Sequence, residues 1–209
     1  MGFCIDMHMH TRRYSKCSVI DPDGLIRQAV RAGLDGIVIT EHHHQWTSAE
    51  LAELVEKSGE FGFLALAAFE YTSSQGDILI YGLDPSQVDA FHPGGPPEEA
   101  VAMAIGLGAV CIAAHPTRAG VSFDERIATL PLHGLEVCSV NLKEHEQRLA
   151  AGLAKSLKKP MMASSDAHQI QEVGRYATEF DEPIQSMADL QRAVLHGRFR
   201  PAGAIPVHP

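Results

Sequence analysis

The sequence predicts an α/β barrel made of a single domain, residues 1–209. Short, continuous apolar segments alternate with amphipathic segments of helical period, which is typical of a mostly parallel sheet covered by helices. Histidines and carboxylates follow the C-terminal ends of several different predicted strands, as in barrels, whereas an open sheet gathers such groups mainly at one switch point. The length suits one core of ordinary size, and no linker divides the chain.

Caps, glycines and prolines set the expected element boundaries. Asp21 and Pro22 form an N-cap and first-turn pair that begins a helix, and Gly33 ends it. The expected strands cover residues 3–6, 36–40, 63–69, 77–81, 110–114, 135–138 and 161–164. The expected helices lie between residues 21 and 33, 48 and 57, 97 and 107, 141 and 160, and 186 and 197.

The helix between residues 141 and 160 is predicted from a cap and a stripe. Asn141 with Glu144 three residues later resembles a capping pair. Leu149, Leu153 and Leu157 recur at helical spacing and are expected to face the core.

Composition and charge narrow the class of protein. Hydrophobic residues make up 45% of the chain and charged residues 21%. This composition is typical of a globular domain rather than of a disordered or a membrane protein. No secretory signal precedes the first strand and no Cys-x-x-Cys pair occurs, so a reducing cytoplasm is the expected location. A formal charge of −9 disfavours binding to extended nucleic acid.

The polar residues at the predicted strand ends suggest a metal centre. His8 and His10 are two positions apart, so an extended backbone places both imidazoles on one face. A mixed nitrogen and oxygen ligand set favours Mn, Zn or Fe over Ca or Mg, and seven ligands exceed what one tetrahedral ion takes. The candidate ligands are His8, His10, His42, Glu70, His115, Asp166 and His168.

Five motifs in order resemble the PHP family (polymerase and histidinol phosphatase), over residues 6 to about 201. The motifs read DMHMHT, GLDGIVITEHH, FE ending at Glu70, AAHPTR and ASSDAH. The resemblance implies a distorted (β/α)7 TIM-like barrel that hydrolyses phosphate esters with two or three divalent transition metal ions. It also implies that the seven candidate residues above are the metal ligands.

Three positions depart from the family pattern. Glu41 stands where the family usually has Asp, and Asp77 stands near a common ligand histidine and is a further candidate ligand. The loop after His10 offers Lys16 where relatives commonly have His or Asp. An ammonium group has no lone pair, so Lys16 cannot bind a metal at neutral pH. Either Cys17 or a loop carboxylate completes a third site, or Lys16 contacts the substrate phosphate.

The expected function is hydrolysis of a small phosphate ester, a phosphomonoester or a nucleotide-like compound, by a metal-bound hydroxide in a multinuclear site. Asp166 is expected to help take the proton, and Lys16, Arg118 and Arg175 are the candidate phosphate-binding residues. Two alternatives remain open: hydrolysis of another ester or amide bond by the same centre, and a catalytically silent, metal-stabilised assembly domain. The expected partner is a small phosphorylated substrate, with no membrane and no extended nucleic acid.

Overall fold

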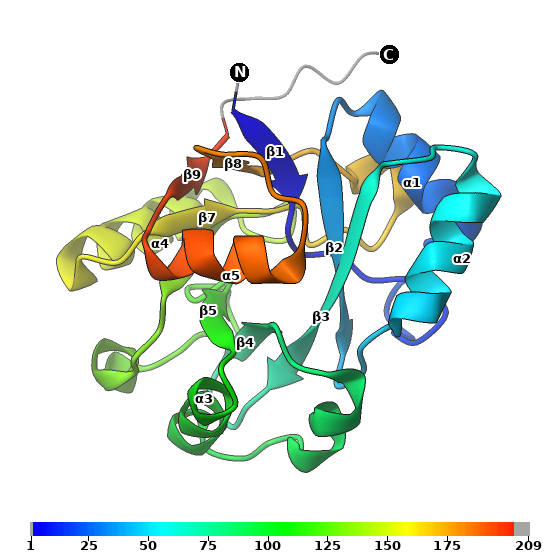
Figure 1. Ribbon diagram of the computed structural model, residues 1–209. Coiled ribbons are helices and arrows are strands. Elements are labelled where there is room, and N and C mark those ends of the chain that lie inside the picture. The colour runs from blue at the N-terminus through cyan, green and yellow to red at the C-terminus, as the bar shows by residue number, and fades with distance from the viewer. Residues whose placement is uncertain (1, 203–209) are drawn as a thin grey trace.

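One sheet of nine strands organises the computed structural model, which describes residues 2–202 (Figure 1). The strand order is β7-β6-β5-β4-β3-β2-β1-β8-β9. The strands are β1 (Phe3–Asp6), β2 (Gly36–His42), β3 (Leu64–Thr72), β4 (Asp77–Tyr81), β5 (Val110–Ala114), β6 (Gly134–Cys138), β7 (Met161–Ala163), β8 (Thr178–Phe180) and β9 (Phe199–Pro201). The Thr178 hydroxyl in β8 donates to the Ala163 carbonyl oxygen in β7 at 2.8 Å, so the sheet nearly closes into a barrel. The barrel prediction is confirmed.

Strand direction differs from a purely parallel barrel at two places. β4 pairs antiparallel with both β3 and β5, and β8 pairs antiparallel with both β1 and β9. Only residues 73–76 join β3 to β4, and so short a connection allows an antiparallel return alone. As a result, Asp77 begins β4 opposite Thr72, beside the C-terminal end of β3.

The helices begin where the sequence places their caps. The Asp21 side chain accepts from the Asp23 amide, and Thr47 forms a reciprocal capping box with Glu50. The helices are α1 (Pro22–Arg31), α2 (Ser48–Ser58), α3 (Pro97–Gly106), α4 (Glu144–Leu157) and α5 (Met187–Leu195), with short 3-10 helices η1 (Pro85–Ala90), η2 (Glu125–Thr129) and η3 (Ile170–Glu172). Within residues 2–202, no helix has the length and apolar character needed to cross a bilayer.

Helix α4 corrects two sequence-based expectations. Its N-cap is Lys143, and Asn141 has another role, described below. Leu149 is 59% exposed, although Leu153 and Leu157 pack against the core. The fully buried residues of this helix are the smaller Ala150 and Ala154, because the helix lies close against the sheet.

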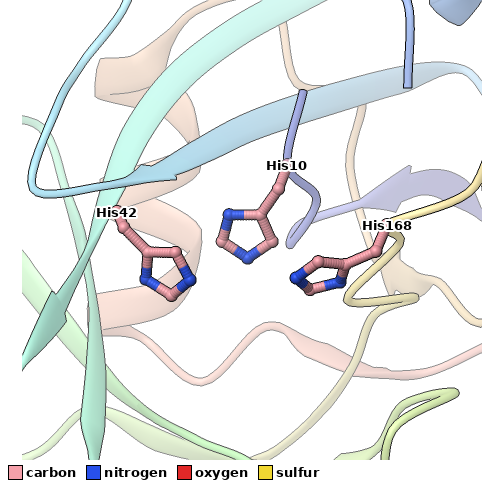
Figure 2. A group of neighbouring side chains, drawn as sticks. All are labelled: His10, His42 and His168. Atoms are coloured by element: carbon pink, nitrogen blue, oxygen red, sulfur yellow. The ribbon is translucent and has the colours of Figure 1, made fainter. Parts of the chain in front are cut away.

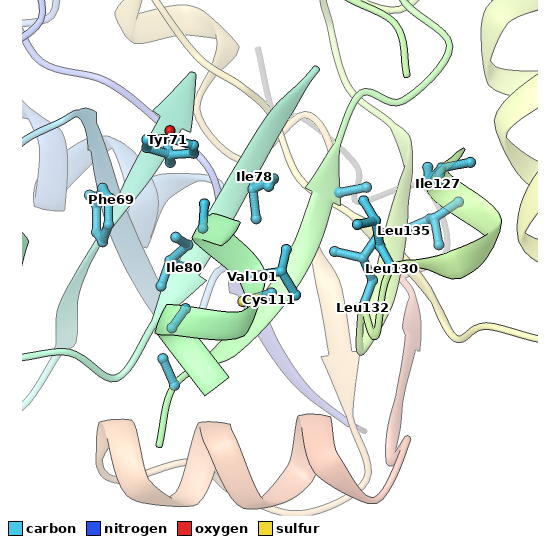
Figure 3. Packing of buried hydrophobic residues seen from close by; sticks show 14 of the residues in the cluster. Phe69, Tyr71, Ile78, Ile80, Val101, Cys111, Ile127, Leu130, Leu132 and Leu135 are labelled. Carbon is cyan, nitrogen blue, oxygen red and sulfur yellow. The ribbon is translucent and has the colours of Figure 1, made fainter. Parts of the chain in front are cut away.

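Apolar side chains fill both sides of the sheet. Phe69, Ile78 and Ile80 pack outward toward α3, where Val101 meets them (Figure 3). On the other face, Leu190 of α5 joins the cluster that includes strand residues of the barrel. The side-chain amide of Gln191, also in α5, donates to the carbonyl of Gly108 just before β5. Helix α5 therefore covers the N-terminal ends of the strands, and the loops at their C-terminal ends frame the site.

Candidate metal centre

The seven predicted ligands converge at the C-terminal ends of the strands, and Asp77 joins them. Among residues 2–202, four groups each contain three potential ligand atoms within 4.8 Å of one another. The groups are His8–His10–Glu70, His8–His115–Asp166, Glu70–Asp77–His115 and His10–His42–His168. The last two groups share no residue, so the side chains define more than one possible ion position.

Glu70, near the end of β3, lies at the centre of the cluster. Its Oε2 atom is 3.4 Å from His8 Nε2, 3.2 Å from His10 Nε2 and 3.1 Å from His42 Nδ1. Its Oε1 atom is 3.1 Å from His115 Nε2. One carboxylate thus faces two different sets of imidazoles with its two oxygens, which is the arrangement of a bridging ligand.

His10, His42 and His168 form a second, more open part of the centre. Figure 2 shows the three imidazole rings turned toward the space between them. The ring centroid of His10 is 4.5 Å from that of His42 and 4.6 Å from that of His168. The His42 side chain is 35% exposed and that of His168 is 24% exposed, so solvent reaches this part.

Buried partners hold the ligands in orientation. His8 Nδ1 is 3.1 Å from Glu136 Oε1, which places a proton on Nδ1 and leaves the Nε2 lone pair facing Glu70 and Asp166. Glu136 also accepts from the His115 amide at 2.7 Å and from the Ser164 hydroxyl. Glu136 is completely buried, and these three contacts give it the role of orienting the side chains around it.

Asn141 was missed as a site residue because its spacing to Glu144 resembles a helix cap. Its side-chain amide donates at 2.8 Å to both the carbonyl oxygen and Oδ2 of Asp166. His168 Nδ1 lies 2.9 Å from the same carbonyl, which directs the His168 Nε2 lone pair away from it. The nearness of Asn141 to a strand end is the one sequence signal that could have indicated this role.

Two ligand residues have left-handed backbone conformations that side chains disfavour. Asp166 has φ 52° and His115 has φ 27°. Such conformations cost of order 1–3 kcal/mol and persist where the surroundings fix them, often at functional sites. Here, the Asp166 amide donates to the His8 carbonyl and the His115 amide donates to Glu136, so hydrogen bonds hold both backbones in place.

Without a bound metal ion, protonated imidazoles balance the negative charges of the buried carboxylates. Burial favours the neutral acid in Glu70, yet the neighbouring His8 charge and the close imidazoles of His10 and His115 lower the pKa of Glu70 well below its usual range. Burial opposes the charge on His115, but its hydrogen bond to Glu70 and the nearby carboxylates raise the pKa of His115 to about 9. For His42, burial prevails and lowers the pKa to about 4. A bound cation can replace the imidazolium protons as the partner of the buried carboxylates.

The donor set fits transition metal ions. Glu70 Oε2 and His115 Nδ1 are buried and lack a hydrogen-bond partner, although Glu70 Oε2 lies near three ring nitrogens. A buried carboxylate oxygen without a donor is costly, and a cation satisfies it. Neutral imidazole nitrogens with carboxylate oxygens are the ligands of Zn, Mn and Fe.

The three predicted phosphate-binding residues differ in placement. Arg118 Nη1 lies 3.8 Å from Asp166 Oδ2, so its guanidinium is beside the centre. Lys16 and Arg175 are exposed, and within residues 2–202 neither side chain makes an ion pair or hydrogen bond with the ligand residues. Their roles stay predictions.

Comparisons with known proteins found one family model and several solved structures that resemble this chain. A PHP-associated family model matches residues 144–199. PsfC from Pseudomonas syringae PB-5123 superposes with a TM-score of 0.71 at 18% identity, covering 97% of this chain and 92% of its own. A Bifidobacterium adolescentis protein described as a metal-dependent phosphoesterase gives 0.65 at 18% identity, covering 91% of this chain and 95% of its own.

The lesion-specific endonuclease EndoQ from Pyrococcus furiosus gives a TM-score of 0.68 at 17% identity, covering 96% of this chain and 58% of the endonuclease. A search of curated protein sequences gave no match. At these identities the structural likeness shows a shared fold. The PHP-associated family model matches about a quarter of the chain, near its C-terminal end.

Proposed function

We propose that this protein is a metal-dependent phosphoesterase that hydrolyses a small phosphate ester with two or three Mn, Zn or Fe ions. The coarser class, a metal-dependent hydrolase, agrees with the fold shared with the Bifidobacterium protein. The observation that carries the proposal is the position of Glu70, which belongs to two of the ligand groups and directs Oε2 toward His10 and Oε1 toward His115. A pair of ions held close together suits in-line displacement at phosphorus, because it stabilises both the attacking and the leaving oxygen.

The ligand residues would hold the ions, which when bound act as Lewis acids and acidify water. Asp166 accepts the proton of the attacking water, because its carboxylate is ionised and faces both His8 and His115. The amide of Asn141 fixes the Asp166 carboxylate in this position. Arg118, at 3.8 Å from Asp166, is close enough to bind a phosphate oxygen of the substrate.

Charge argues for a small substrate over a polynucleotide. The formal charge of −9 repels an extended phosphate backbone, whereas cations and Arg118 at one point suffice for a single phosphate.

Steady-state assays of the Mn-loaded protein against phosphomonoesters, phosphodiesters, nucleotides and lactones test the proposal. The expected result is metal-dependent release of phosphate from at least one small monoester, abolished by a chelator and restored by Mn. Hydrolysis of lactones alone would contradict phosphoester chemistry, and metal binding without any hydrolysis would favour an assembly role.

A further inference from the structure

We propose that the first turn of α4 positions two side chains at the metal centre, through its residues Glu146 and Gln147. This inference rests on the proposed phosphoesterase function. The two side chains are those of Arg118 and Asn141, and both reach Oδ2 of Asp166. The Asn141 side-chain amide donates to this oxygen at 2.8 Å, and Arg118 Nη1 lies 3.8 Å from it. Neither residue belongs to a helix or a strand, so other contacts have to fix its backbone.

Glu146 binds the residues on both sides of Arg118, in the loop of residues 115–119. The Thr117 hydroxyl donates to the Glu146 carbonyl oxygen at 2.7 Å. The Ala119 amide donates to Glu146 Oε1 at 2.9 Å. The backbone around Arg118 is therefore fixed from both sides, while the Arg118 side chain stays 39% exposed and accessible to an anion.

The same turn of α4 binds the residues on both sides of Asn141, in the loop of residues 139–143. The Lys143 amide donates to Glu146 Oε2 at 2.8 Å. The Gln147 side-chain amide donates to two carbonyl oxygens of this loop, at 3.2 Å to Ser139 and at 3.1 Å to Leu142. These bonds fix the backbone from which the Asn141 amide reaches the metal centre.

A helix cap alone does not account for Glu146. A glutamate at the third helical position often accepts from the N-cap amide, and the bond from Lys143 is of that kind. That contact uses one carboxylate oxygen. Here the other oxygen accepts from Ala119, which lies 27 positions away in the sequence, and Glu146 is only 4% exposed. One carboxylate thus joins two loops whose side chains meet at Asp166.

The two side chains serve different steps of the proposed reaction, so the effects of misplacing them differ. Arg118 contributes charge-assisted binding of a phosphate oxygen, and its displacement weakens phosphate affinity. Asn141 holds Asp166, which is both a candidate metal ligand and the proton acceptor. Groups that orient a ligand typically change metal affinity or activity by about 10–100-fold when they are lost, so displacement of Asn141 lowers both.

Three variants separate the two loops without touching a metal ligand or a residue that reaches Asp166. Thr117→Val removes a hydroxyl that holds residues 115–119, and Gln147→Leu removes an amide that holds residues 139–143. Glu146→Gln keeps the size of the side chain but offers one acceptor oxygen to two backbone amides, so it loosens both loops.

Two further variants are matched controls. Glu144→Gln changes a glutamate of the same helical turn whose side chain is 85% exposed. Tyr176→Phe removes the remaining partner of Gln147 Nε2, a hydroxyl at 3.2 Å that lies outside both loops. All proteins are loaded at saturating Mn and measured for the Kd of inorganic phosphate by calorimetry and for kcat with p-nitrophenyl phosphate. Mn affinity is measured separately.

We expect Thr117→Val to weaken phosphate binding about 3- to 10-fold, as for one lost hydrogen bond, with Mn affinity unchanged. Gln147→Leu should lower kcat and Mn affinity about 10-fold and leave phosphate binding unchanged. Glu146→Gln should show both effects, and the controls neither. In an Arg118→Ala background, Glu146→Gln should weaken phosphate binding no further, whereas a general loss of structure would still do so.

Three results would overturn the inference while leaving the proposed function standing. They are parental values in all three variants, the same pattern of losses in Thr117→Val and Gln147→Leu, and additive effects of Glu146→Gln and Arg118→Ala on phosphate binding. If the parent hydrolyses no phosphoester, the proposed function fails, and the phosphate and Mn affinities decide. The separation described above then supports positioning by α4, and its absence, or a parent that binds no phosphate, overturns it.

Discussion

Asp166 combines an unusual backbone with a central chemical position. Its φ of 52° lies in the left-handed region, which Asn adopts more readily than most residues. Asp166→Asn should therefore keep the fold while removing a negative ligand and a proton acceptor. We expect phosphoester turnover to fall by about 10²–10⁴-fold, with a smaller loss of metal. Single-substrate kinetics with metal analysis measure both, and parental turnover in this variant would remove Asp166 from the mechanism.

Lys16 is the residue at which this chain departs most from the PHP family motifs that its sequence resembles. It is exposed, in the loop that also carries Ser15, which contacts His10 and His42. We expect Lys16→Ala to raise KM for a phosphorylated substrate about two- to fivefold with unchanged metal content, as for an exposed ion pair of about 0.2–1 kcal/mol. Arg31→Ala, in the last turn of α1, serves as a matched charge control. Identical kinetics for the two variants would show that Lys16 is only a surface residue.

At the scale of elements, the sequence predicted long apolar strands better than short or polar ones. β2, β4 and β5 are buried runs, and their positions follow from composition alone. β8 and β9 have three residues each, too few to show a period, so they were missed. Strand direction was predicted where helices connect the strands and missed at β4, where the short turn decides it.

The convergence of the candidate ligands was predictable because each lies in or just after the C-terminal part of a strand, but the residues that contact and orient them were not. Glu136 lies in β6 and Asn141 just after it, and only the approach of β6 to β1 and β7 brings them to His8 and Asp166. The five motifs quoted above contain the seven candidate ligands, but they do not include Glu136 or Asn141. His43 and His44, which directly follow the candidate ligand His42, line a neighbouring pocket.

The segment before β6 gives a pH-dependent prediction at a distance from the centre. His133 is partly buried, and its Nδ1 accepts from the Cys111 amide at 3.0 Å. Burial lowers the pKa of His133, so the unfolded chain binds a proton more readily than the folded one as the pH falls. This histidine therefore contributes nothing against unfolding above its unfolded pKa of about 6.5 and destabilises the fold progressively below it.

His133→Asn should flatten the dependence of the unfolding free energy on pH between about pH 7 and 5, by at most about 1.4 kcal/mol per pH unit. Urea denaturation of the chelator-treated parent and variant at several pH values measures the difference. Equal slopes for the two proteins would contradict the assignment of this titration to His133.

For the whole molecule, the metal centre links the C-terminal ends of β2, β3, β5 and the loops after β1 and β7. An ion bound only by the folded chain stabilises it by about 2.7 kcal/mol at 100 times its Kd. For a chain of this size that raises Tm by roughly 5–10 °C. Thermal melts with Mn or with a chelator test this, and unchanged Tm values under saturating Mn would contradict ion binding to the native barrel.

The central claim, that Glu70 bridges ions held by His8, His10, His115 and Asp166, is tested most directly by anomalous diffraction from Mn- or Zn-loaded crystals, with elemental analysis of the same preparation. The account predicts two or more metal peaks per chain, with ligand bonds of about 2.0–2.2 Å and both Glu70 oxygens engaged. A metal-loaded protein whose ions lie elsewhere, or a centre that stays without metal at saturating concentration, would contradict it.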